Sequence, residues 1–110
     1  MDGPSHTPLS PVVFHILLAI ADGHEHGYAI GKAVEETSGL RTGPGTIYGS
    51  LQRMERDGLV EEVEGGEDRR KPFVMTELGR RALEVEAARI DRLAALARSR
   101  DLVPNSDPVG

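Results

Sequence analysis

The segment 44–57 carries polar side chains at helical spacing beside an apolar stripe. Its apolar residues Ile47, Leu51 and Met54 recur at intervals of four and then three, which is typical of a helix packed on a core. At about 100° per residue, the opposite side of this helix is polar or lacks side chains. That side and its edges hold Gly45, Thr46, Tyr48, Gly49, Gln52, Arg53 and Arg56. Such a helix presents a surface that can bind a partner.

The side chains on this surface have the chemistry that double-stranded DNA requires. The hydroxyl groups of Thr46 and Tyr48 suit phosphate oxygens, whereas Gln52, Arg53 and Arg56 can reach base edges. The alternative is a solvated helix face whose arginines pair with the acidic residues beside them.

The composition narrows the class of protein. The chain has a net charge of −5, from 13 basic and 18 acidic residues, so it is unsuited to coating nucleic acid nonspecifically. Aromatic residues make up only 4%, which argues against a stacking platform for single strands. Cysteine is absent, which excludes disulfides and thiolate metal sites. No apolar run approaches the roughly 20 residues of a membrane span, so we expect a cytoplasmic protein that does not bind membranes.

Two shorter helices are expected before the segment 44–57. Ser10 is a suitable N-cap, Pro11 suits the first helical position, and residues 12–21 are nearly all apolar. A helix that is apolar on all sides needs cover on all sides, so we expect one face of this helix to meet a second subunit. Residues 28–37 form the next helix. Because a glycine-containing connection joins it to the helix 44–57, the two form a helix-turn-helix.

A β-hairpin is expected after Gly58, which ends the helix 44–57. Residues 59–64 and 73–75 are the predicted strands, separated by a turn that contains Gly-Gly. The basic triplet at the tip consists of Arg69, Arg70 and Lys71. We expect this triplet to bind phosphates, although it can also be read as a solvated loop that adjacent acids neutralise. A helix-turn-helix followed by a hairpin is a winged helix.

One long helix is expected near the C-terminal end, with Thr76 as its N-cap. Its apolar stripe consists of Leu83, Ala87, Ile90, Ala94 and Ala97, widened by Leu93 and Leu96. This helix has little domain to fold onto, so we expect it to pack against a second subunit. The predicted fold is mainly α with a small β-hairpin. It comprises a flexible tail (1–8), a winged helix-turn-helix domain (9–76), a C-terminal dimerisation helix (77–100) and a second flexible tail (101–110).

Four pieces of the chain occur in an order and spacing that is specific in combination. They are HGYAIGKAVEE at 26–36, PGTIYGSLQRMERDGLVE at 44–61, the basic hairpin, and MTELGRRAL at 75–83. Together they resemble the PadR family of bacterial transcriptional regulators, and the single C-terminal helix resembles the shorter subgroup of that family. The resemblance implies a homodimer of winged-helix domains that represses a nearby operon.

The resemblance also implies positions on DNA. It places the helix that carries Thr46, Tyr48 and Arg53 in the major groove, and the wing against the backbone or the minor groove. It also implies that Tyr28, in the HGY piece, contacts a phosphate. The chain departs from the family at two glycines: serine is common at position 43, and proline is common at position 49.

The function expected from these observations is that of a homodimeric repressor that binds a double-stranded DNA operator. We expect a small apolar effector to release it by occupying a space between the subunits. The residues predicted to line that space are Val13, Phe14, Leu17, Ile90 and Leu93.

Two other functions are open on the sequence alone. The acidic balance is compatible with a winged-helix module that contacts proteins and not DNA. The sequence His24-Glu25-His26 is compatible with a metal-responsive regulator, although it supplies too few ligands for a site, so we expect no metal and no other cofactor. Neither a GxxxxGK[ST] loop nor an H-E-x-x-H or G-x-S-x-G motif occurs, and we expect no enzymatic activity.

Overall fold

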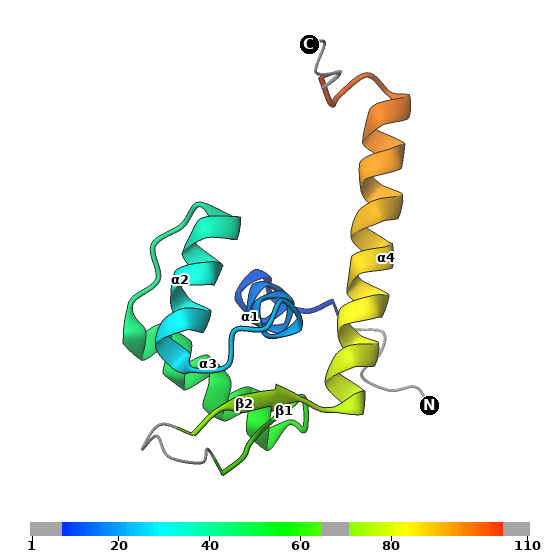
Figure 1. Ribbon diagram of the computed structural model, residues 1–110. Coiled ribbons are helices and arrows are strands. Elements are labelled where there is room, and N and C mark those ends of the chain that lie inside the picture. Colours follow the sequence, from blue (N-terminus) through cyan, green and yellow to red (C-terminus); the bar gives the residue numbers. More distant parts are fainter. Residues whose placement is uncertain (1–7, 65–70, 105–110) are drawn as a thin grey trace.

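The computed structural model describes residues 8–64 and 71–104, which form four helices and one hairpin (Figure 1). In chain order these are α1 (Pro11–Ala21), α2 (Gly27–Ser38), α3 (Pro44–Arg56), β1 (Val60–Glu62), β2 (Phe73–Met75) and α4 (Glu77–Ser99). The predicted class, mainly α with a small β-hairpin in a winged helix-turn-helix, is confirmed.

The first helix begins and ends where the sequence predicts. Ser10 is the N-cap of α1, and its Oγ accepts a hydrogen bond from the Val13 N–H at 3.2 Å. Pro11 occupies the first turn, where its missing N–H leaves no intrahelical bond unmade. Asp22 is the C-cap, and Gly23 follows with a φ of 103°, a conformation that glycine adopts without steric cost.

The three N-terminal helices and the hairpin surround one core. Figure 1 shows α1 end-on between α2 and α4, with α3 and the two strands beneath it. The most deeply buried side chains are Ile16, Leu17, Ile30, Val34, Ile47, Leu51, Met54 and Val60. The apolar stripe predicted for α3 is therefore confirmed, and each such side chain stabilises the fold by roughly 1.5–3 kcal/mol relative to an exposed one.

The apolar helix α1 is covered in large part by its own protomer. Ile16 and Leu17 are fully buried, and Val12, Val13, Phe14 and Ile20 are partly buried against the same core. Its one polar residue, His15, hydrogen-bonds through Nδ1 to the hydroxyl of Thr37 in α2 at 2.8 Å. The surface of α1 that is left for a second subunit is thus narrower than its all-apolar sequence predicts.

The hairpin pairs β1 with β2 in antiparallel register, with Val60 opposite Met75. The first strand is shorter than the predicted 59–64. Gly58 adopts a φ of 83°, and the Leu59 N–H then donates to the Met54 carbonyl at 2.8 Å. Residue 59 therefore belongs to the C-terminal end of α3, where it bonds to one of the helix's last carbonyl groups.

Thr76 joins the end of the hairpin to α4. Its Oγ1 accepts a hydrogen bond from the Gly79 N–H at 3.0 Å, which is the predicted N-cap contact. The same hydroxyl donates to the Gly58 carbonyl at 2.5 Å, and the Thr76 N–H donates to the Leu59 carbonyl at 3.1 Å. The first turn of α4 is thus bound directly to the chain that follows α3.

The second half of α4 extends away from the rest of the protomer (Figure 1). Its large apolar side chains are 40–50% exposed; they are Ile90, Leu93 and Leu96. The helix ends in a turn in which Asp101 has a φ of 56° and the Leu102 N–H donates to the Ala97 carbonyl at 2.9 Å. Most of the two predicted tails, residues 1–7 and 105–110, lies outside the described residues.

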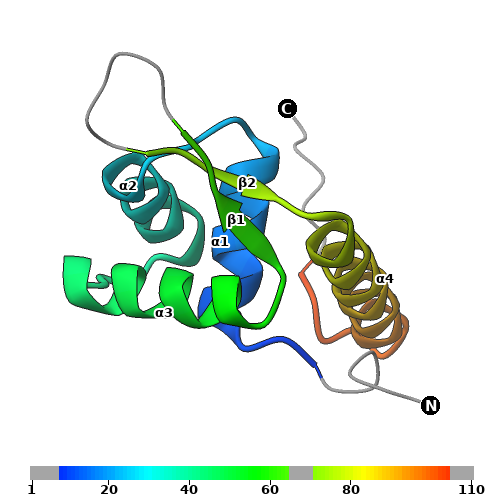
Figure 2. The same ribbon diagram turned by 90° about the horizontal axis from the view of Figure 1, so that it is seen from below.

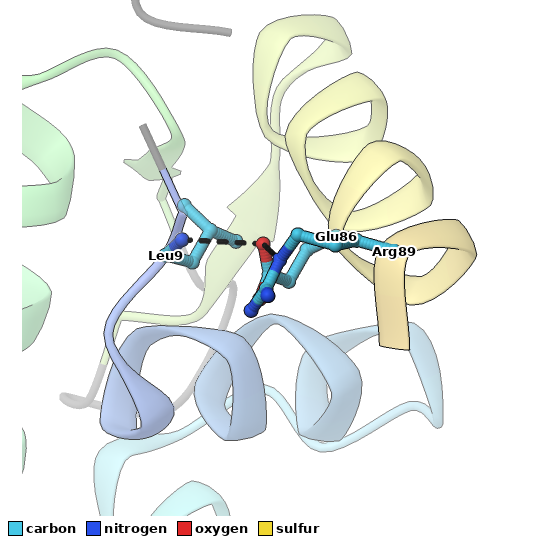
Figure 3. Close-up of polar contacts among 3 residues, drawn as sticks. All are labelled: Leu9, Glu86 and Arg89. Carbon is cyan, nitrogen blue, oxygen red and sulfur yellow. Dashed lines mark hydrogen bonds and ion pairs between the residues drawn. The ribbon is translucent and has the colours of Figure 1, made fainter. Parts of the chain in front are cut away.

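A buried carboxylate on α4 holds the segment that precedes α1 (Figure 3). Glu86 is 5% exposed, and its Oε1 accepts a hydrogen bond from the Leu9 N–H at 3.3 Å. Arg89, one turn later, donates from Nε to the same oxygen at 3.3 Å and from Nη2 to Oε2 at 2.5 Å. The hydrogen bond from Arg89 is the main reason why the pKa of Glu86 lies below its ordinary value of 4.5; desolvation opposes this shift and the Leu9 N–H adds to it.

We predict that Gly79→Ala destabilises the protein, although alanine normally favours a helix over glycine by about 1 kcal/mol. A methyl group at Gly79 would overlap the Leu59 carbonyl oxygen and lie 3.0 Å from Met75 Cγ. Overpacking of this kind costs about 1–3 kcal/mol. The control is Gly31→Ala, whose methyl would lie at an ordinary 3.5 Å from Ile47 Cγ1. Equal midpoints of urea unfolding for the two variants would contradict the prediction.

Glu86→Gln should lower the thermal midpoint at pH 7, because it removes the charge that Arg89 and the Leu9 N–H stabilise. Because the folded-state pKa of Glu86 is lowered, its contribution is fully present above pH 4.5 and is lost as the pH falls through that folded-state pKa. The difference in midpoint between wild type and variant should therefore shrink below pH 4.5. The matched control is Glu84→Gln, which removes an exposed pair with Arg80 on the same helix. A difference that does not change between pH 7 and pH 3 would count against this account.

Candidate nucleic-acid interface

The connection between α2 and α3 sets the angle at which α3 is presented. Gly39 ends α2 with a φ of 73°. The next residues are held by side chains of α2, because the Thr42 N–H donates to Glu35 Oε2 at 3.2 Å and the Leu40 N–H to Ser38 Oγ at 3.0 Å. The sequence does not predict this role of Glu35, because a charged residue on a helix face gives no sign that it accepts a hydrogen bond from a loop.

The N-terminus of α3 lacks a side-chain cap. Gly43 is the N-cap residue, and no side-chain hydrogen bond is made there. Pro44 occupies the first turn, so one of the unpaired N–H groups of a helix start is removed. A methyl group at Gly43 or Gly45 would meet no atom within 4 Å. The backbone at this end of the helix is therefore accessible to a partner.

The polar face predicted for α3 is present and faces away from the core. Figure 2 shows α3 along one side of the domain, beside the hairpin. Thr46, Gln52, Arg53 and Arg56 are exposed and lie on this helix, as does Gly45. The guanidinium of Arg53 turns back toward the N-terminus of α3 and donates from Nη2 to Ser50 Oγ at 3.4 Å. The structure thus brings these predicted residues to one surface.

Tyr48 differs from the other predicted residues because part of its ring is packed. The side chain is 47% exposed, and its ring lies against Gly27, the first residue of α2. A methyl group at Gly27 would lie 2.6 Å from Tyr48 Cε1 and would overlap the hydroxyl end of the ring. Tyr28, the next residue of α2, is 70% exposed. The structure therefore adds Gly27 to the site, and the only signal for it in the sequence is the glycine of the HGY piece.

The wing is only partly described. Arg69 and Arg70 lie outside the described residues, whereas Lys71 is exposed and its Nζ lies 3.8 Å from Glu64 Oε2. The wing is held against the start of the helix-turn-helix, because the Phe73 N–H donates to the Glu25 carbonyl at 2.9 Å. Its base is thus fixed relative to α2.

Within residues 8–64 and 71–104, the arginines on the outer face of α3 form no ion pairs. Arg53 bonds to a serine hydroxyl, and Arg56 has no acidic partner in this part of the chain. Glu55 turns away from them, since its Oε2 accepts a hydrogen bond from the Glu62 N–H at 3.4 Å. Among the described residues, neither arginine forms the ion pair with Glu55 or Asp57 that the alternative reading of this face would require.

The histidines do not assemble a metal site in the described part of the chain. His26 is half-buried and serves as the N-cap residue of α2 without a side-chain hydrogen bond. Among the described residues, no group of three or more His, Asp or Glu side chains is placed to hold a metal ion.

The residues predicted to line the effector site differ in how deeply they are buried. Leu17 is fully buried in the core of the protomer, so it faces inward and is not available to line a space between subunits. Val13 and Phe14 are partly buried, and Ile90 and Leu93 are 40% and 50% exposed. These four remain on or near the surface.

A family model described as the transcriptional regulator PadR-like family matches residues 16–85. The chain belongs to this family. The match runs from the second half of α1 to the first part of α4 and includes every described residue of the polar α3 face. The protein thus combines a winged-helix fold with membership of a family of transcriptional regulators.

Two curated relatives and one solved structure illustrate the similarity. An uncharacterized 37.1 kDa protein in transposon TN4556 of Streptomyces fradiae is 48% identical over 79 residues, which are 72% of this chain and 23% of that protein. The chain thus spans about a quarter of that relative. The transcriptional regulator Rv3488 of Mycobacterium tuberculosis is 36% identical over 86 residues, which are 76% of this chain and 78% of the relative.

The solved structure is that of a PadR family transcription regulator from Clostridium difficile. It superposes with a TM-score of 0.72 at 24% identity and covers 82% of this chain and 97% of the other. At this identity the similarity shows the shared fold. Within the described residues of the present protein, no helix has the length and apolar character needed to cross a bilayer.

Proposed function

We propose that this regulator acts as a homodimeric repressor that recognises a specific operator through the outer face of α3. One observation carries the proposal: the exposed polar side chains of α3 lie on one face, and its arginines have no ion-pair partner among the described residues. An arginine that is free of acids can form a bidentate contact with the edge of a guanine.

The residues of the site form two groups, one suited to phosphate contacts and the other to base contacts. Thr46, Tyr48 and Tyr28 present hydroxyl groups at the ends of α2 and α3 that face each other, where they suit phosphate oxygens. Gln52 and Arg53, together with Arg56 further along, suit base edges in the major groove. The exposed backbone around Gly45 allows close approach of a phosphate to the start of α3. The wing triplet would bind phosphates beside this surface.

The proposed dimer rests on α4. Its second half leaves the domain and exposes Ile90, Leu93 and Leu96 along one stripe. Apolar side chains at this spacing on a projecting helix are suited to packing against a second copy. Dimerisation would place two α3 helices on one DNA duplex and so double the number of base contacts.

Release by a small apolar effector is part of the same proposal. Val13 and Phe14 on α1, and Ile90 and Leu93 on α4, are the residues that would line its site at the subunit boundary. Binding there would shift the angle between the two protomers, which changes the spacing of the α3 helices.

A protein-binding role is the second candidate, because Glu61, Glu62 and Glu64 are exposed along the hairpin and Glu64 lies near Lys71. An acidic wing disfavours phosphate contacts. This candidate and the repressor differ in whether the protein binds DNA in a salt-dependent manner.

The DNA-binding proposal can be tested by fluorescence anisotropy with DNA from upstream of the protein's own gene and with random DNA, at two salt concentrations. Arg53→Ala should weaken binding to the operator by about tenfold or more, because a bidentate base contact contributes about 1–3 kcal/mol. Its affinity for random DNA should be nearly unchanged. Replacing Arg69, Arg70 and Lys71 by Ala should weaken binding to both DNAs and reduce the salt slope by up to about 3.

The control for the DNA experiment is Arg98→Ala, an exposed arginine near the end of α4. Binding that is absent at low salt, or that does not change with salt, would favour the protein-binding role. Equal loss on both DNAs for Arg53→Ala would remove its assignment to base recognition.

The dimer proposal predicts a mass of two chains by light scattering at micromolar concentration. Leu93→Glu should shift the protein toward the mass of one chain, because it places a charge in the proposed apolar interface. Leu40→Glu is the matched control, since Leu40 is 65% exposed in the connection between α2 and α3. A wild-type protein with the mass of a single chain would refute the dimer.

A further inference from the structure

The absence of a side chain at Gly27 leaves room for the ring of Tyr48. It is buried at the first position of α2, in a helical conformation that any residue can adopt. A conformational requirement therefore does not explain a glycine here. The explanation lies in the space, because the Tyr48 ring occupies the position that a methyl group on Gly27 would take.

The close approach is specific to the hydroxyl end of the ring. The three Tyr48 atoms nearest to a methyl at Gly27 would be Cζ, the hydroxyl oxygen and Cε1, the last at 2.6 Å. These atoms are the ones whose position decides where the hydroxyl points. With alanine at position 27, the ring would have to rotate or move outward, since contacts under 3 Å between such atoms are not tolerated.

Gly27 lies against the hydroxyl end of the Tyr48 ring, the part of the side chain farthest from its own helix. The side chain starts from α3 and is 47% exposed, so a large part of the ring is in contact with solvent. A half-exposed tyrosine ring that lacks a packing partner samples more than one rotamer. The backbone of α2 at Gly27 supplies the packing surface that selects one of them.

We propose that Gly27 is a positioning residue for DNA binding, because its lack of a side chain lets the Tyr48 ring pack on α2 and fixes where the hydroxyl is presented. The inference rests on the proposed DNA-binding role of Tyr48. The angle between α2 and α3 and the rotamer of Tyr48 together determine the position of the Tyr48 hydroxyl. Gly27 allows this combination because it has no side chain that would collide with the ring. Gly27 itself does not contact DNA in this account.

The test compares two glycine-to-alanine changes in the same helix. Gly27→Ala should weaken binding to the operator by about tenfold, the size expected when one hydrogen bond to a charged group is lost. Gly31→Ala should stay within about twofold of wild type, because its methyl would be in ordinary contact with Ile47 Cγ1 at 3.5 Å. Equal affinities for the two variants would overturn the inference.

A double-mutant cycle separates positioning from general damage. Tyr48→Phe keeps the ring and removes the hydroxyl, and by itself it should weaken binding to a similar extent. In the Tyr48→Phe background, Gly27→Ala should cause no further loss, since no hydroxyl is left to misplace. A full additional loss in that background would show that Gly27→Ala acts by disturbing the fold, and would refute the positioning role.

The ring can also be observed without DNA. The chain has two tyrosines and no tryptophan, so the Tyr48 ring signals in an NMR spectrum can be assigned with the help of Tyr28→Phe. Gly27→Ala should shift these signals strongly, and Gly31→Ala should not. Unshifted signals would overturn the inference even if DNA binding is confirmed, whereas a wild-type protein that fails to bind any DNA would overturn the proposed function and the inference with it.

Discussion

The position of α4 relative to α3 depends on the hydroxyl group of Thr76. It caps α4 at Gly79 and also donates to the carbonyl of Gly58, at the end of α3. The adjacent Leu59 carbonyl accepts from the Thr76 N–H and leaves no room for a side chain at Gly79. The two hydrogen bonds from Thr76 to Gly58 and Leu59, and the close packing of Gly79 on Leu59, thus fix the start of α4 against the end of α3. In a dimer formed through α4, this junction would transmit the position of one helix to the other.

A second contact between distant segments lies about two turns beyond Gly79 along α4. Glu86 is buried because the chain before α1 passes over it, and Arg89 and the Leu9 N–H compensate for the loss of water around the carboxylate. Beyond this point Ile90, Leu93 and Leu96 of α4 are 40–50% exposed. These are the side chains on which the proposed dimer rests.

The acidic charge of the chain is compatible with DNA binding because of where the acids lie. Glu55 bonds to the backbone of β1, Glu86 pairs with Arg89, and Glu77 and Glu84 pair with arginines of α4. The arginines of α3 are not among those pairs in the described residues. The net charge of −5 therefore includes acids that are bonded or paired away from the arginines of α3.

Local signals determined much of the fold. The cap at Ser10 with Pro11, the stripe of Ile47, Leu51 and Met54, and the cap at Thr76 each depend on neighbours within a few residues, so the sequence alone predicts the helices and the outer face of α3. The predicted start of the first strand at Leu59 is wrong because strand propensity does not indicate that the Leu59 N–H bonds to the end of the preceding helix.

Only the tertiary structure decided the contacts between residues far apart in the chain. Leu17 was expected at a subunit boundary, yet it is in the core, because an all-apolar helix does not reveal which of its faces the domain covers. The packing of Tyr48 on Gly27 and the bond from Leu9 to Glu86 join residues 21 and 77 positions apart. No periodicity or spacing carries that information, since such contacts follow from how the helices cross and not from the residues along any one of them.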